Sequence, residues 1–179
     1  MSDIASRLGM DVPKLTDRAQ ERIREIIPYA GTRNPVDITG QALNDPSLVE
    51  KCLDILIEED VCDIIVIYMA MATQSPALAE IFMEIFRNIR RKHPEVPIVV
   101  GVYAEGERRR ELEELGYIVS REPTRAVGIA ASLLNFGRSF AADMPPAPIP
   151  ENRVVVPAET LNEVAAKKLL ASAGIPVVD

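Results

Sequence analysis

Two short stretches of the 179-residue chain combine small polar side chains with turn-forming residues, a composition that ligand-binding loops use. The first is residues 34–40, with the sequence NPVDITG. Its proline stiffens the backbone, while its Asn, Asp, Thr and Gly residues provide turn chemistry and short polar groups. On composition alone, a capped loop is the favoured interpretation of this stretch.

The second stretch is residues 70–75 (AMATQS), which follow an apolar run and precede Pro76. In open parallel sheets, ligands bind beyond the carboxyl ends of the strands, and this stretch has that position. The helix that begins after it offers free N–H groups, so Gln74 and Ser75 are predicted to face an anion such as phosphate. The helix dipole contributes only about 0.3–1 kcal/mol at an exposed site, so other elements must close over the ligand.

The remaining reactive groups favour structural roles. His93, in the string RKHP, is interpreted as a solvated histidine at a helix end. Cys52 and Cys62 fit no metal spacing and are interpreted as inert, reduced thiols. The charged stretch of residues 105–114 is typical of a solvated helix face. The sequence contains no P-loop and no G-x-G-x-x-G motif, so we predict no catalytic residue and no metal site in this chain.

Composition narrows the class of protein. The chain has 20 Lys and Arg residues against 27 Asp and Glu residues, a formal net charge of −7, which argues against broad capture of nucleic acid or of an anionic membrane. No apolar run approaches the ~20 residues of a membrane span, and residues 1–15 lack a signal-peptide core. A cytoplasmic location is therefore the default expectation.

The elements that must position these groups alternate along the chain. Apolar runs rich in β-branched residues predict strands over residues 63–69, 96–103 and 117–120. Helices are predicted over residues 17–27, 105–115 and 123–136, from Asp45-Pro46 to residues 58–60, and from Ser75-Pro76 to Lys92. Gly116 and Gly137 are predicted to end their helices. Strands separated by helices predict a parallel α/β sheet with right-handed crossovers.

The composition changes after Gly137. Residues 141–150 are rich in proline and predict an extended linker. Residues 153–156 form a short strand candidate, and Thr160 with Glu163 predicts a capping box that opens a last helix, which Gly174 ends. This last unit is too small to bury a core of its own.

Several of these strings together resemble a known family, the NDP-forming acyl-CoA synthetases, which include succinyl-CoA synthetase and ADP-forming acetate–CoA ligases. The resemblance starts at residues 12–15 (VPKL), is most specific at residues 34–42 (NPVDITGQA), and continues through the predicted strands to residues 114–117 (ELGY). It covers nearly the whole chain. The same modules occur in lysine acetyltransferases of the acetyl-CoA-synthetase-like type.

The resemblance implies a fold and a domain organisation. Residues 1–140 resemble the family's second flavodoxin-like domain, of the succinyl-CoA synthetase type, which has a parallel sheet with helices on both faces. The domain's first, central strand is expected to be missing, so that an interior sheet edge is left free and either self-association or a partner covers it. Residues 141–157 are expected to be a linker, and residues 158–179 resemble the beginning of an ATP-grasp domain.

The resemblance also implies a function. The family converts acid, CoA and NTP to acyl-CoA, NDP and phosphate through an acyl phosphate and a phosphohistidine. By resemblance, Asn34, Met71, Ala72 and Thr73 line the acyl site, and Gln74 and Ser75 start the helix that faces phosphate. CoA, ATP or ADP, and Mg²⁺ are implied for the full assembly and none for this chain alone. The expected partners are upstream CoA-binding and phosphohistidine domains and a downstream ATP-grasp domain, without which the chain is expected to be inactive.

Two other functions remain as alternatives. The chain could be an interaction or sensing module of an acyl-CoA-dependent lysine acetyltransferase. It could also be a stand-alone flavodoxin-like binding or receiver domain. A receiver needs acidic residues at early strand ends, but Asp63 begins its predicted strand. A flavin site would have only Tyr68 and Tyr103 as aromatic candidates, and packing at the edge of the core explains both.

Overall fold

Three parallel strands form the sheet of the computed structural model, which describes residues 1–141 and 154–178, with the side chain of Thr73 outside the description. The strands are β1 (Ile65–Ala70), β2 (Ile98–Val102) and β3 (Ile118–Ser120), in the order β1-β2-β3. Ile65 pairs with Ile98, and Val99 pairs with Ile118. The predicted parallel α/β sheet is confirmed, and it is consistent with a flavodoxin-like fold.

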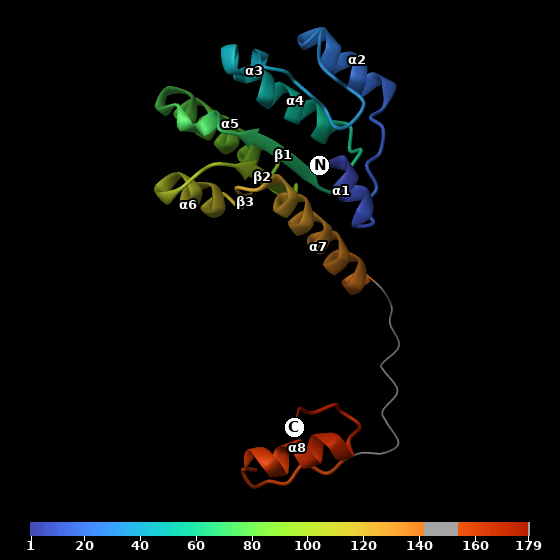
Figure 1. Cartoon of the computed structure of the whole chain (residues 1–179). Helices are drawn as coiled ribbons and strands as arrows, with labels where there is room; N and C mark the ends of the chain where they lie inside the picture. Colours follow the sequence, from blue (N-terminus) through green and yellow to red (C-terminus); the bar gives the residue numbers. More distant parts are fainter. Residues whose placement is uncertain (142–153, 179) are drawn as a thin grey trace. The chain divides into compact units, whose positions relative to one another are not determined.

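Helices cover both faces of this sheet (Figure 1). One face carries α7 (Pro123–Ala141), which packs on all three strands and on α1 (Ser2–Arg7). The other face carries α4 (Ser47–Glu58), α5 (Pro76–Lys92) and α6 (Gly106–Glu114). Outside α4 lie α2 (Asp17–Ile26) and the short α3 (Gln41–Asn44).

The side chains of β2 show why the two helical layers form. All of its residues are buried, as expected of the central strand of a covered sheet. Because side chains alternate along a strand, Val99 packs with Ala126 and Ala130 of α7, while Val100 packs in the opposite core with Phe82 and its neighbours on α5.

Arg90 holds the junction between α5, β2 and β3. Its guanidinium donates to the carbonyl oxygens of Pro94 (2.9 Å) and Val96 (3.0 Å), and more weakly to that of Gly116 (3.3 Å). Its charge also lies 4.5 Å from the centre of the Tyr117 ring. Gly116 has φ +85° and ends α6 as predicted.

Three predictions about secondary structure were wrong. Gly137 does not end its helix, because α7 continues to Ala141 and no competing residue in the left-handed region stops it. Thr160 does not form the capping box, since the Asn162 side chain accepts the N–H of Ala165 (2.9 Å) and α8 (Glu163–Ser172) begins one residue later. The strand candidate at 153–156 is irregular at 154–156, and Arg153 lies outside the described residues.

The chain divides into two units, Met1–Ala141 and Ala142–Asp179. In the described part of the second unit, α8 buries none of its residues. The predicted linker falls mostly at 142–153, outside the described residues, and the assignment of residues 158–179 to an ATP-grasp domain stays a prediction. Within the described ranges, no helix has the length and apolar character that crossing a lipid bilayer would require.

Candidate functional site

A groove of about 600 Å³ runs along the edge of β1 that faces away from β2. Its floor is the strand itself. Apolar side chains of α1, α7 and the segment after α1 form part of the wall, and apolar side chains of α4 form another part. These apolar side chains include Ala5, Val127, Leu134, Leu53 and Leu56. Charged side chains also line the groove, namely Asp11, Asp37, Asp63 and Arg138.

Asn34 lies at this groove, within a tightly bonded loop. Its side-chain N–H donates to the carbonyl oxygen of Pro13 (2.9 Å), and its backbone has φ +81°. Gly31 and Asp37 form an antiparallel bridge around it, and the Asp37 carboxylate accepts the N–H of Thr39 (2.8 Å). The capped loop that composition favours is therefore present. No described residue donates a hydrogen bond to the side-chain oxygen of Asn34, which leaves an acceptor at the groove.

The second predicted stretch follows β1 at the carboxyl end of the sheet. Met71 is 59% exposed, and Ala72, Thr73 and Gln74 form a 3₁₀ turn, η1 (Ala72–Gln74). The Gln74 side chain donates to the carbonyl oxygen of Tyr103 (2.7 Å), so it ties this loop to the end of β2. The Ser75 side chain makes no capping hydrogen bond to α5.

Charges near this end of the sheet are paired with one another. Arg121 forms an ion pair with Glu105 and lies 4.5 Å from the centre of the Tyr103 ring. Glu105 follows β2 and Arg121 follows β3, so this ion pair lies at the carboxyl end of the sheet, as the start of α5 does. The role of Gln74 and Ser75 in binding an anion stays a prediction.

The described side chains of the second predicted stretch do not line the groove that Asn34 lines. Asn34 lines the groove, whereas Met71, Ala72, Gln74 and Ser75 do not. Asn34 is bonded to the segment that leads into α2, and Thr16 there donates to Glu59 (3.2 Å), which precedes β1. Met71 instead follows the last residue of β1. The stretches therefore lie toward opposite ends of this strand.

The other reactive groups have structural partners. His93 is not a freely solvated side chain as predicted, because its Nε2 lies 3.0 Å from the Asp54 carboxylate on α4. Lys92 pairs with the same Asp54 (2.8 Å) and with Glu50 (2.9 Å), so α4 is clamped to the end of α5. Sequence reasoning missed this cluster because its members are about 40 residues apart and only the packing of the two helices joins them.

Both cysteines lie in the groove wall, and burial sets their chemistry. Burial raises the pKa of the Cys52 thiol to about 11 and also raises that of Cys62. A raised pKa keeps both thiols protonated at neutral pH, which agrees with their interpretation as inert thiols. In the part of the chain that the structure covers, no group of three or more His, Cys, Asp or Glu side chains is arranged to hold a metal ion.

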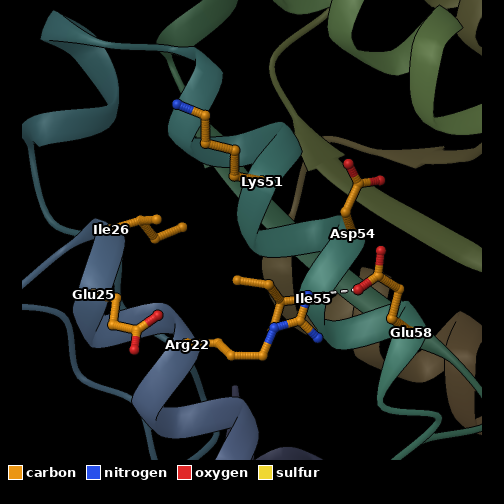
Figure 2. Close-up of a pocket in the computed structure, with 7 residues that line it drawn as sticks. All are labelled: Arg22, Glu25, Ile26, Lys51, Asp54, Ile55 and Glu58. Atoms are coloured by element: carbon orange, nitrogen blue, oxygen red, sulfur yellow. Dashed lines mark hydrogen bonds and ion pairs between the residues drawn. The ribbon is translucent and has the colours of Figure 1, made fainter.

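A second, shallow pocket of about 330 Å³ lies between α2 and α4 (Figure 2). Arg22 reaches across it to Glu58 (2.5 Å) and Glu59 (3.0 Å). Its hydrogen bond to Glu59 lowers the pKa of that carboxyl. Arg22 thus ties α2 to α4 across this pocket, while Glu25 and Lys51, which also line it, form no ion pair with another described residue.

Comparisons with known proteins point to one class of enzyme. The chain is 31% identical over 138 residues to the alpha subunit of ADP-forming acetate–CoA ligase I from Pyrococcus furiosus. That match takes in 76% of this chain and 30% of the relative. It is also 36% identical over 59 residues, 32% of the chain and 8% of the relative, to a trans-feruloyl-CoA synthase from an unknown prokaryotic organism.

No protein-family model matches the chain. The chain spans less than a third of the length of each of these two curated relatives. An α/β fold with a parallel sheet, together with these two similarities, relates the chain to acyl-CoA ligases.

Proposed function

We propose that this chain supplies the second flavodoxin-like domain of an NDP-forming acyl-CoA synthetase and contributes to the site of the acyl phosphate and the phosphohistidine. The observation that carries the proposal is the 138-residue similarity to an acetate–CoA ligase subunit, which extends over most of the chain. The parallel sheet with helices on both faces supports it. Both relatives are named for CoA-ligase chemistry, which favours this function over an acetyltransferase module or a receiver domain.

In this proposal the chain binds and orients, and its neighbours carry the chemistry. Asn34 offers a side-chain acceptor that could receive a hydrogen bond from a bound acid. Met71, Ala72 and Thr73 would present backbone at the end of β1, and Gln74 and Ser75 would present the start of α5 to a phosphate. Since these groups lie toward opposite ends of β1, they would serve different parts of the assembled site.

The cofactors of the reaction belong to the rest of the assembly. The described residues contain no carboxylate cluster suited to Mg²⁺, and His93 is held by Asp54 away from the groove. We therefore assign CoA, the nucleotide, Mg²⁺ and the phosphorylated histidine to upstream and downstream domains, and we propose that the chain alone is inactive.

A domain exchange tests the proposal. The 138 matching residues of the Pyrococcus furiosus ligase alpha subunit would be replaced by those of this chain, and the chimera combined with the rest of that enzyme. Formation of ATP from ADP, phosphate and acetyl-CoA is expected in the chimera and not in a variant that lacks the region. A folded chimera that is as inactive as the deletion variant would contradict the proposal.

Asn34 gives a sharper test within the chimera, because its backbone and its side chain can be separated. Asn34→Gly keeps the positive φ but removes the amide, so we expect activity to fall at least about tenfold with folding changed by about 1 kcal/mol. Asn34→Ala adds backbone strain of about 1–2 kcal/mol and should unfold at lower denaturant concentration. If Asn34→Gly retains full activity, Asn34 is only a turn residue.

A further inference from the structure

The turn that joins β1 to α5 is bonded to a single residue after β2 from two sides. β1 ends at Ala70, and its pairing register with β2 shifts between Tyr68 and Ala70. The N–H of Tyr103 donates to the carbonyl oxygen of Ala70 (3.0 Å). The side-chain amide of Gln74 donates to the carbonyl oxygen of Tyr103 (2.7 Å). Tyr103 therefore holds the turn both at its start and at its end.

Tyr103 is a firm anchor for these bonds. Its neighbours Val102 and Ala104 are 0% and 3% exposed, so packing fixes the main chain on both sides of it. Arg121, which follows β3, lies 4.5 Å from the centre of the Tyr103 ring and is paired with Glu105. A hydrogen bond to the Tyr103 carbonyl oxygen thus places the turn relative to all three strands of the sheet.

The conformation of the turn needs such support. Ala70 has φ +46°, in the left-handed region that a residue with a side chain seldom adopts, and such a backbone persists only where its surroundings fix it. In the second half of the turn, the N–H of Gln74 bonds locally, to the carbonyl oxygen of Met71 (2.9 Å), and the Ser75 side chain does not cap α5. The Gln74 side chain is what joins this half of the turn to β2.

The effect of this bond is local. Gln74 is exposed, and holding a long exposed side chain in one rotamer costs conformational entropy comparable with the net gain from one hydrogen bond. The bond therefore adds little to the stability of the whole chain. What it fixes is the position of η1 and of the first residues of α5, which follow Gln74 directly.

We propose that Gln74 is a positioning residue, whose side chain holds the main chain that enters α5 in the place where it meets the acyl phosphate. This inference rests on the proposed function and deepens it. The Gln74 side chain then holds the backbone that faces the anion and does not contact the anion itself. Because reacting groups must be aligned closely, losing a positioning contact lowers kcat more than it weakens binding.

The first part of the test uses the full chain alone. Backbone order parameters from ¹⁵N relaxation are measured in the wild type, in Gln74→Ala and in Asn135→Ala, which removes an exposed amide from α7 as a matched control. In Gln74→Ala we expect the values for residues 71–75 to fall from about 0.85 to below about 0.6, while β2 is unchanged. Asn135→Ala should leave residues 71–75 as in the wild type. An unchanged turn in Gln74→Ala would overturn the inference.

The second part uses the chimera with the Pyrococcus furiosus ligase and compares Gln74→Ala with Gln74→Glu. Neither variant can donate to Tyr103, because a carboxylate only accepts hydrogen bonds. We expect kcat for ATP formation to fall at least about tenfold in both, with the KM for phosphate within about twofold. Asn135→Ala should keep kcat within about twofold. If Gln74 contacts the phosphate directly, Gln74→Glu will instead raise the KM for phosphate far more than Gln74→Ala, since a carboxylate repels the anion, and the inference is wrong.

The outcomes separate this inference from the proposed function. An inactive parent chimera contradicts the proposed function, and the positioning role falls with it. An active parent chimera whose Gln74→Ala variant retains its kcat contradicts the positioning role alone.

Discussion

Tyr117 illustrates how single side chains hold this fold. Its hydroxyl donates to the carbonyl oxygen of Phe86 (2.8 Å), and its ring meets the Phe86 ring edge-on at 5.1 Å. Burial raises the pKa of Tyr117 to about 12. The neutral phenol is thus the form that the folded chain favours.

We predict that Tyr117→Phe costs about 1 kcal/mol at neutral pH, because a buried hydrogen bond is lost while the ring is kept. The pH dependence has a definite sign. The folded-state pKa lies above the unfolded value near 10, so the contribution is fully present below pH 10 and is lost as pH rises from about 10 to 12. Urea unfolding of the wild type should show this loss, and that of Tyr117→Phe should show less of it.

Tyr29→Phe is the control for this experiment, since Tyr29 is 81% exposed. It should unfold like the wild type at every pH. If Tyr117→Phe and the wild type lose stability in parallel above pH 10, the titration of Tyr117 does not contribute.

At the scale of the elements, replacing either of two glycines by alanine should change the free energy of unfolding, and the two changes should have opposite signs. A Cβ on Gly101 in β2 would lie 2.9 Å from Cδ2 of Tyr68 and 3.3 Å from the carbonyl oxygen of Ile67. Gly101→Ala should therefore destabilise the sheet by about 1–3 kcal/mol. Gly137 lies within α7 with nothing near its would-be Cβ, so Gly137→Ala should stabilise by about 0.5–1 kcal/mol. Guanidinium unfolding measures both, and two changes of the same sign would contradict this account.

Strands and helices could be predicted from the sequence where a local signal decided them. The β-branched runs gave β1 and β2 within two residues at either end, and Pro76 marked the first residue of α5. Gly137 misled because a helix tolerates glycine when its remaining residues favour the helix and no residue there takes a positive φ. Asn162, and not Thr160, caps α8. Both residue types are good N-caps, so the sequence did not decide which of the two begins the helix.

The groove could not be predicted in its details, although a free edge was expected. Its walls come from segments as far apart as Ala5, Leu53 and Leu134, which only the packing of α1, α4 and α7 brings together. The same reason hid the pairing of His93 with Asp54. Asn34 could be singled out from its string, but its distance from Met71 depends on the path of a loop that carries no periodic signal.

For the whole molecule, the position of the core leads to a prediction about folding. Every buried residue in the described ranges belongs to the first unit, and α8 buries none. Residues 1–141 alone should therefore unfold in one cooperative transition. A peptide of residues 154–178 should show little helix by circular dichroism, since an isolated helix of about ten residues is marginal in water. A cooperative melt of this peptide would show that the second unit has a core of its own.

The two thiols in the groove wall allow access to the groove to be measured by chemical labelling. An alkylating reagent such as iodoacetamide attacks the thiolate, and burial keeps Cys52 and Cys62 almost wholly protonated at neutral pH. Labelling therefore proceeds slowly and only as far as the reagent can enter beside β1. A ligand bound in the groove would shield both sulfur atoms, so the labelled fraction of the chain would fall as the groove is filled.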